Sequence, residues 1–306
     1  MTHRVASLTA LEILDSRGLP TESVQLSLAD GSTGTAGVPS GASTATREAV
    51  ELRDGDQTRY GGAGVSGAVA NVNGEIADAL VGQVIENLAA LDALLVDLDG
   101  TDAKGRLGAN AIVGVSMAAA RAFAGAAGQP RYRHLAPAGV EPRLPVPCFN
   151  VINGGRHAAN RLQPQEFMVC PLGAPTFAEA LRVGAEVYAA LRGRLQAAGT
   201  AVGLGDEGGF APELSTAEEA LGMLVGAIAD AGYSARRDGV AIALDPAASE
   251  FRGADGRYAL VSAGATMSSA ELVERWAELT ARYPIWSLED GLGEDDTDGW
   301  KLLTER

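Results

Sequence analysis

Four short apolar segments in the second half of the chain constrain the fold more than any other feature. They lie at residues 147–152, 166–171, 240–244 and 285–288. Each is long enough for one buried strand, and amphipathic helical segments separate them. Three of those helices begin with a Ser or Thr followed three residues later by Glu, the pattern of a capping box. The pairs are Thr176 with Glu179, Ser215 with Glu218, and Ser268 with Glu271. In residues 240–244 large side chains alternate with alanine, as the layers of a barrel require. Alternating strands and helices therefore predict an α/β barrel.

The first half of the chain has a different pattern and predicts a separate α+β domain. Residues 5–40 alternate apolar and polar side chains, as in an antiparallel meander. Residues 67–127 are rich in alanine and predict helices. A passage rich in Gly and Pro follows at 125–147, where few contacts are expected to cross. We therefore predict domains at residues 1–137 and 138–306.

The composition limits the classes of partner. A net charge of -15 argues against binding to nucleic acid, and it fits a charged small ligand held through a cation. The two cysteines, Cys148 and Cys170, lie in apolar segments and suggest no disulfide framework. The N-terminus lacks the apolar core of a signal peptide, and no apolar run approaches the roughly 18 residues of a membrane helix. We expect a soluble cytoplasmic protein without a membrane partner.

Residues 205–212, with the sequence Gly-Asp-Glu-Gly-Gly-Phe-Ala-Pro, are the motif around which the candidate chemistry gathers. Glycines permit tight turns and the close approach of a ligand, and we expect them to place Glu207 in a cleft. Burial raises the pKa of a carboxyl group and so suits it to general-acid catalysis. The same residues could form an acidic surface turn, and the pattern alone does not separate the two interpretations.

Two further residues could join Glu207. Glu166 opens an otherwise apolar strand, so its carboxylate is expected to be half-buried and to need a partner. A second acid beside the first would separate the pKa values of the two groups. His157 lies in a polar, glycine-rich loop whose composition suggests a ligand contact. A histidine on the surface is the simpler alternative.

Two of the predicted strands end directly in an acid. Asp245 follows residues 240–244, and Glu289 follows residues 285–288. Neighbouring parallel strands lie about 4.8 Å apart, so both carboxylates can reach one ion at the carboxyl face of a barrel. Oxygen ligands favour a hard cation, Mg²⁺ before Ca²⁺ or Mn²⁺. A single acid at a strand end is often a helix cap instead.

A set of longer motifs resembles one known family. The motifs are LEILDSRG at 11–18, VPSGAST at 38–44, EAVELRDG at 48–55, LGANAI at 107–112, NVINGG at 150–155, QEFM at 165–168, GDEGGFAP at 205–212, ALD at 243–245, AASE at 247–250 and SLED at 287–290. Together they resemble enolase (phosphopyruvate hydratase) over essentially the whole chain. The resemblance implies an N-terminal α+β capping domain, followed by a TIM-type barrel whose first two strands are antiparallel. It also implies a Mg²⁺-dependent lyase of glycolysis that dehydrates 2-phospho-D-glycerate to phosphoenolpyruvate.

The resemblance assigns roles to the candidate residues. Glu207 is implied to be the acid that helps the hydroxide leave, with Glu166 as its hydrogen-bonded neighbour in contact with substrate. His157 lies on a loop that is implied to close over the substrate.

The metal ligands and the assembly follow from the same resemblance. Asp245 and Glu289 look like two of three carboxylates on the first Mg²⁺, and Ser43 lies on a lid that reaches a second ion. Members of the family are commonly homodimers, so we expect a homodimer when the chain is complete.

The chain also departs from the family pattern. It stops at Arg306, before the expected third metal carboxylate, the lysine that removes the C2 proton, a second lysine and the phosphate-binding segment. The barrel is therefore expected to be partial, and the 306 residues alone to be inactive and poorly soluble. We interpret them as an incomplete record of a longer protein.

Two other functions stay open. Leu19, Ala63, Pro246 and Gly291 differ from the usual enolase residues. They are compatible with a paralogue such as the carboxyphosphonoenolpyruvate synthase of phosphonate biosynthesis, which would act on another phosphorylated or phosphonylated hydroxy acid. The other alternative to an enolase is a non-catalytic, enolase-like binding protein.

Overall fold

The structure is a computed structural model that describes residues 2–41, 45–158, 160–200, 202–260 and 264–306. The chain divides into two compact units, Met1–Arg143 and Leu144–Arg306. Each unit has its own hydrophobic core. The two units are therefore described separately.

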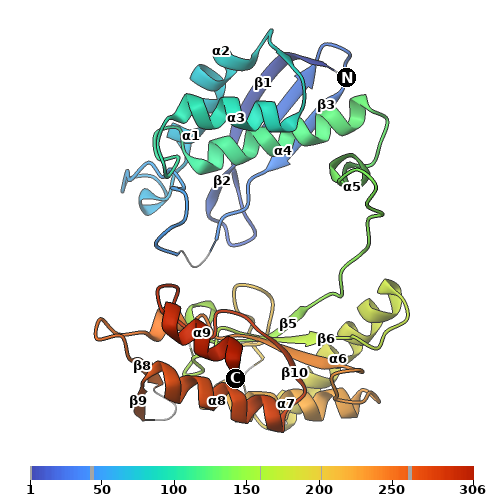
Figure 1. The fold of residues 1–306 in the computed structure, drawn as a ribbon, viewed down its shortest axis with the longest axis vertical. Helices are drawn as coiled ribbons and strands as arrows, with labels where there is room; N and C mark the ends of the chain where they lie inside the picture. Colours follow the sequence, from blue (N-terminus) through green and yellow to red (C-terminus); the bar gives the residue numbers. More distant parts are fainter. Residues whose placement is uncertain (1, 42–44, 159, 201, 261–263) are drawn as a thin grey trace. The chain divides into compact units, whose positions relative to one another are not determined.

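The N-terminal unit is an antiparallel sheet covered by helices (Figure 1). Its strands, in the order β3-β2-β1-β4, are β1 (His3–Leu14), β2 (Pro20–Leu28), β3 (Thr33–Gly37) and β4 (Val84–Ile85). Its helices are α1 (Ser66–Asn71), a π-helical turn (Val72–Ile76), α2 (Ala77–Leu80), α3 (Leu88–Asp99), α4 (Ala109–Ala126) and α5 (Arg131–Leu135). The predicted meander is confirmed. The two-residue strand β4 was not predicted.

Helix α4 is the centre of this core. It is long and apolar enough to cross a membrane by composition alone, but 61% of it is buried inside the unit. A Cβ on Gly114 would come within 2.6 Å of the Val24 side chain, so the helix needs glycine there to approach the sheet. We interpret α4 as a core helix. The same core contains a fully buried acid, Glu22 on β2.

The second unit is built on a four-stranded sheet in the order β10-β7-β6-β5. The strands are β5 (Phe149–Asn153), β6 (Glu166–Cys170), β7 (Ala241–Asp245) and β10 (Ile285–Leu288). Its α-helices are α6 (Phe177–Ala197), α7 (Ala217–Asp230), α8 (Ser269–Arg282) and α9 (Thr297–Glu305). A separate hairpin of β8 (Tyr258–Leu260) and β9 (Ala265–Met267) was not predicted. Strands β5 and β6 are antiparallel, as expected, and β7 is parallel to β10. The unit is thus a partial barrel.

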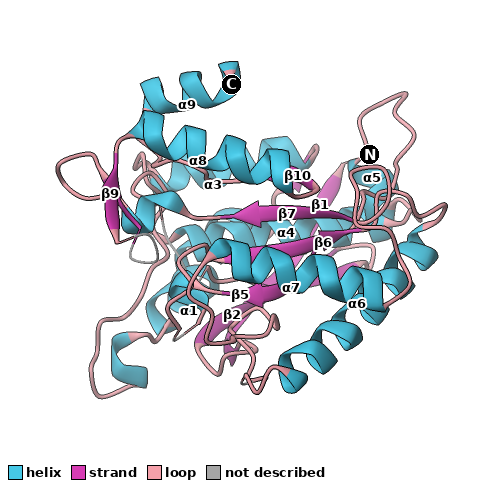
Figure 2. Ribbon diagram, turned by 90° about the horizontal axis from the view of Figure 1, so that it is seen from below, coloured by secondary structure: helices cyan, strands magenta, loops and turns pink. Residues whose placement is uncertain are grey.

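The two faces of this sheet have different side chains. On β7, Ile242 and Leu244 join the core formed with the helices, which Figure 2 shows along one side of β5, β6 and β7. Ala241 and Ala243 instead join a small cluster with Cys170 on the other face. The predicted alternation of large residues with alanine is therefore confirmed. On β7 the large side chains therefore pack against the helices, and the alanines lie on the inner face of the sheet.

The helix N-termini differ in two cases from the predicted capping boxes. At α6, Thr176 accepts from the N–H of Glu179, but within the described residues the reciprocal bond of a box is absent. Ser268 and Glu271 form the expected capping box of α8. The box of α7 is formed by Thr216 and Glu219, so the predicted pair, Ser215 with Glu218, is wrong by one residue. Because α7 begins at Ala217, the residue just before it occupies the N-cap position.

Candidate functional site

One end of the β10-β7-β6-β5 sheet gathers the candidate residues from five chain segments, the four strands and residues 205–212. Asn153 ends β5, Glu166 begins β6 and Asp245 ends β7. Glu166 lies directly opposite Asp245 in the antiparallel pairing of β6 with β7. Glu289 follows the last residue of β10. The strand directions therefore place these polar groups at one edge of the sheet.

The fifth segment, residues 205–212, packs alongside β5. The backbone N–H of Asn153 donates to the carbonyl of Phe210 at 2.8 Å, and the N–H of Phe210 donates to the carbonyl of Val151 at 2.9 Å. The Asn150 amide donates to Glu207 Oε2 at 2.8 Å. These bonds attach the acidic motif to the strand and so fix where Glu207 lies.

The glycines of the motif serve this attachment. Gly208 has a φ of +82°, in the left-handed region that favours glycine. A Cβ on Gly205 would lie 2.7 Å from the Asn153 side chain, and a Cβ on Gly209 would lie 2.5 Å from Asn153 Oδ1. The motif therefore needs glycine both to turn and to lie against a fully buried asparagine.

Glu166 and Glu207 form the expected acid pair, but the buried member is Glu166. The Glu207 side chain is 38% exposed, so the expectation that it would lie buried in a cleft is wrong. The adjacent residues Asp206 and Gly208 are exposed as well, so this part of the motif is open to solvent. Burial raises the pKa of Glu166 to about 9, and a hydrogen bond to Glu207 and the nearby negative charge act in the same direction. Glu166 thus holds a proton at neutral pH next to an accessible carboxylate.

His157 lies beside this pair and is buried, in contrast to the surface alternative. It ends a 3-10 turn, Gly155–His157, in the connection between β5 and β6. Its Nδ1 lies 3.3 Å from Glu207 Oε1, without the alignment of a hydrogen bond. On the other side of the ring, Nε2 lies 2.6 Å from Gln165 Nε2. The structure therefore brings together His157, Glu166 and Glu207.

Gln165 is the residue that sequence reasoning missed. It belongs to the QEFM motif, but no role was assigned to it because a glutamine carries no charge and does not titrate. It is buried, and its Oε1 has no hydrogen-bond partner among the described residues. One feature of the sequence could have identified Gln165. It lies directly before Glu166, which opens β6 at the site.

Asp245 and Glu289 lie next to each other on parallel strands. Leu244 and Leu288 are paired, and the N–H of Glu289 donates to the carbonyl of Leu244 at 2.9 Å. Burial raises the pKa of Asp245 to about 6, and the charges of Glu289, Asp290 and Glu207 contribute. The backbone is strained beside both acids, because Ala247 and Asp290 have φ values of +49° and +41°. Such strain is concentrated at functional sites.

This donor set fits a hard cation. Within the described part of the chain, neither Asp245 nor Glu289 belongs to an ion pair, so their repulsion has no positive charge to balance it. One ligand atom from each of His157, Glu166 and Glu207 also lies within 4.8 Å of the others, a second arrangement that could hold an ion. That set fits less well, because Glu166 retains its proton. Ser43 lies outside the described residues, so its predicted role stays a prediction.

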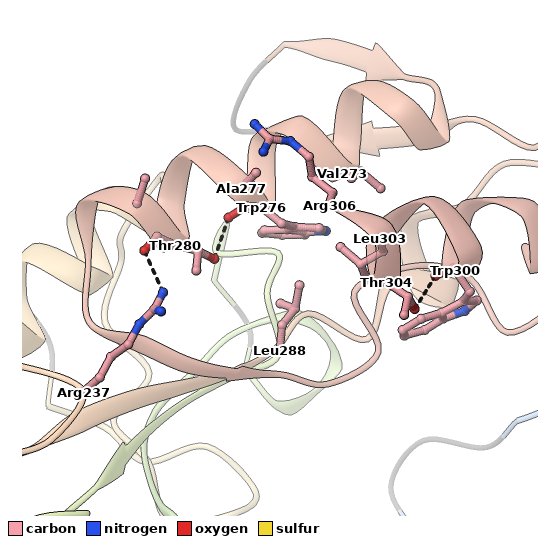
Figure 3. Close-up of a pocket in the computed structure, with 11 residues that line it drawn as sticks. Arg237, Val273, Trp276, Ala277, Thr280, Leu288, Trp300, Leu303, Thr304 and Arg306 are labelled. Atoms are coloured by element: carbon pink, nitrogen blue, oxygen red, sulfur yellow. Dashed lines mark hydrogen bonds between the residues drawn. The ribbon is translucent and has the colours of Figure 1, made fainter.

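A different pocket lies among α8, β10 and α9, with a volume of about 580 Å³ (Figure 3). Its lining is mostly apolar, including Trp276, Leu288 and Trp300, together with Arg237 and Arg306. It is lined by no His, Cys, Asp or Glu. The pocket therefore lacks the groups for acid–base or metal chemistry, and the edge that carries Glu166 is the better candidate site.

Comparison with known proteins finds matches over both units of the chain. Residues 5–135 match the family described as "Enolase, N-terminal domain", and residues 141–306 match "Enolase, C-terminal TIM barrel domain". The chain is 53% identical over 302 residues to a protein named enolase from Rubrobacter xylanophilus. That alignment covers 99% of the chain and 70% of the relative.

Proposed function

The chain belongs to the enolase family, and we propose that its residues serve the Mg²⁺-dependent dehydration of 2-phospho-D-glycerate to phosphoenolpyruvate. The observation that carries the proposal is geometric: ligand atoms of Glu166, Glu207 and His157 lie within 4.8 Å of one another, and Asp245 lies directly opposite Glu166 on β7. Burial raises the pKa of Glu166 to about 9, so it is the protonated member of the acid pair at neutral pH. The edge thus combines an acid with a carboxylate ligand for a cation. The proposed elimination of water uses both.

The acid pair supplies the proton for the leaving group. Glu207 is exposed and faces the space where a substrate hydroxyl could bind, and it donates a proton to the hydroxide as the C–O bond breaks. Glu166 shares its proton with Glu207 and keeps the pair singly protonated at neutral pH. The step releases water, and the pair of Glu166 and Glu207 then carries one more negative charge.

Asp245 and Glu289 hold the cation in this proposal. When bound, Mg²⁺ supplies positive charge against which negative charge develops on the substrate. His157 contacts the substrate from the connection between β5 and β6. The base that removes the C2 proton is not among these residues. We expect it in the part of the family that has no counterpart here, since the chain spans 70% of the relative's length.

For the complete protein we propose two further properties of the family, a cytoplasmic location and a homodimeric assembly. The 306 residues expressed alone are expected to be inactive, because the described sheet has only four strands and two open edges. The intact mass of the protein in its source cells tests this: a mass near 31.3 kDa combined with full activity would contradict it.

The test of the function is the formation of phosphoenolpyruvate from 2-phosphoglycerate by the protein as its source cells make it, with and without Mg²⁺. The Glu207→Gln variant is expected to lose roughly 10²–10⁴ in kcat, the usual contribution of a general acid. The matched control is Asp238→Asn, which changes an acid that is 79% exposed and paired with Arg236. Turnover of a phosphonate analogue but not of 2-phosphoglycerate would instead identify the pathway-specific paralogue. No turnover with either would favour the binding protein.

A further inference from the structure

The two cysteines of the chain face each other across β5 and β6. Phe149 pairs with Val169 in the antiparallel register, so Cys148 and Cys170 occupy the next rung. Their Sγ atoms lie 3.3 Å apart. Directly opposed residues in an antiparallel pair have Cα atoms about 4.5–5.5 Å apart, inside the range of about 4.4–6.8 Å that a disulfide spans. The backbone can therefore accept a bond between them without moving.

The two thiols differ in their surroundings. Cys148 is exposed and Cys170 is buried, packed with Met168, Ala241 and Ala243 on the inner face of the sheet. Burial and the contact with Cys148 raise the pKa of the Cys170 thiol. Since the thiolate is the nucleophile, a reagent from solvent reacts first at Cys148. The arrangement has one accessible thiol and one adjacent protected thiol.

We propose that Cys148 and Cys170 are a redox modification site that forms a reversible disulfide with an oxidised low-molecular-weight thiol. The Cys148 thiolate attacks one sulfur of the small disulfide, which releases one small thiol and leaves a mixed disulfide on Cys148. The Cys170 thiol gives up its proton to solvent and attacks the Cys148 sulfur, which releases the second small thiol. Two protein thiols are oxidised and one small disulfide is reduced to two thiols. The second step is the slow one, because Cys170 is seldom a thiolate.

The bond would close the β5–β6 hairpin at its open end. Strand β5 ends at Asn153 and β6 begins at Glu166, and the connection between them carries His157. Cross-linking the far ends of both strands fixes their register and restricts separation of the pair. The oxidation state of two thiols is thereby coupled to the rigidity of the segment that holds the candidate site. This inference stands on strand register and sulfur contact, and it is independent of the proposed catalytic function.

The experiment incubates the full protein with oxidised glutathione and then counts free thiols with a maleimide in denaturant. Because residues 1–306 contain two cysteines, Cys148 and Cys170, the peptide that contains each can be assigned by mass spectrometry. The expected result is an intramolecular disulfide that joins the two peptides, after transient glutathionylation of Cys148, with both thiols restored by dithiothreitol. Cys170→Ala is expected to stop at the glutathione adduct, and Cys148→Ala to stay unmodified while folded. A lasting adduct on Cys148 beside a free Cys170 in the wild type would overturn the proposal.

Amide hydrogen exchange provides the second readout, and it does not depend on catalysis. Exchange in residues 149–169 is expected to slow on oxidation of the wild type and to be unchanged by oxidant in Cys170→Ala. The alanine keeps the small apolar volume of the inner face, so the variant should retain its fold. Equal exchange in oxidised and reduced wild type would overturn the coupling between the thiols and the hairpin.

Discussion

Gln165 Nε2 lies 2.6 Å from His157 Nε2, and both side chains are buried. An amide nitrogen can only donate, so the imidazole Nε2 accepts and carries no proton. The proton of the neutral ring is then on Nδ1, the nitrogen that faces Glu207 Oε1 at 3.3 Å. A neutral glutamine thus selects the tautomer of the histidine, with the Nδ1 proton on the side of the ring that is nearest Glu207.

Replacing Gln165 with leucine is expected to change the tautomer of His157. The chain has three histidines, so the imidazole signals of ¹⁵N-labelled protein can be assigned with few variants. We expect His157 to carry its proton on Nδ1 in the wild type, and Gln165→Leu to lose that preference. Gln163→Leu is the matched control, because Gln163 lies two residues away and donates to Ala259 O instead. An unchanged ¹⁵N pattern in Gln165→Leu would show that the amide does not select the tautomer.

Binding of Mg²⁺ is expected to weaken as the pH falls below about 6. The pKa of Asp245 is raised to about 6, chiefly by burial, and a protonated carboxyl is a poor ligand. Each further pH unit should therefore reduce the affinity about tenfold through this group. Isothermal titration calorimetry at pH 8, 6 and 5 measures the effect. Asp245→Asn should bind more weakly, by at least the roughly 10–100-fold that loss of an outer-shell partner costs, while Asp238→Asn should not change. An affinity that is flat with pH in the wild type would contradict the assignment.

Glu22 is expected to make the N-terminal unit less stable as the pH rises. Burial raises its pKa to about 7 from an ordinary value of 4.5, and the charge of Glu51 adds to the shift. In the part of the chain that the structure describes, neither of its carboxylate oxygens has a hydrogen-bond partner. Between these values the folded state binds a proton that the unfolded chain does not, so the free energy of unfolding falls from pH 4.5 to about 7 and then levels off. The full effect is roughly 3 kcal/mol.

Urea denaturation of wild type and Glu22→Gln tests this effect. The variant should be more stable than the wild type at pH 8, and the two should converge near pH 4.5, because glutamine does not ionise. Glu86→Gln, a change at an exposed position, is the control and should follow the wild type at each pH. A constant difference between Glu22→Gln and wild type at all pH values would show that the charge on Glu22 is not responsible.

Two glycines in the second unit should respond in opposite directions to replacement by alanine. At Gly209 the new Cβ would lie 2.5 Å from Asn153 Oδ1, so Gly209→Ala should destabilise the unit by about 1–3 kcal/mol and displace Glu207. At Gly222, inside α7, no atom lies within 4 Å of the new Cβ, and Gly222→Ala should stabilise by up to about 1 kcal/mol. Urea midpoints of both variants measure the two effects. Equal midpoints would contradict the close approach at Gly209.

The fold and the positions of the charged site residues could be predicted from the sequence because both depend on local pattern. Strand ends at Asp245 and the strand start at Glu166 follow from apolar runs bounded by acids, and their convergence follows from strand direction. The exposure of Glu207 could not be predicted, because it depends on how residues 205–212 attach to β5 through long-range hydrogen bonds. The contact of Gln165 with His157 could not be predicted for the same reason. A contact between two side chains far apart in sequence leaves no periodic signal in either segment.

The contact between Cys148 and Cys170 was missed for a related reason. It requires the register of β5 with β6, and a register is set by pairing and by the intervening connection rather than by either strand alone. The predicted capping box of α7 is wrong by one residue for a different reason, which is local to the sequence. Ser215 and Thr216 are both good N-caps, and both Glu218 and Glu219 are available, so the pattern permits two solutions.

The hairpin of β5 and β6 also sets the order in which the site is assembled during synthesis. The two strands are joined by a short connection, whereas α6 and α7 separate β6 from β7 along the chain. During synthesis, β5 and β6, with His157 and Glu166, therefore leave the ribosome well before β7 and β10 have been made. Glu207 emerges next and completes the proton-holding side. The residues of the proposed cation site are thus the last of the candidate residues to be made, and that site cannot form before β7 and β10 have joined the sheet.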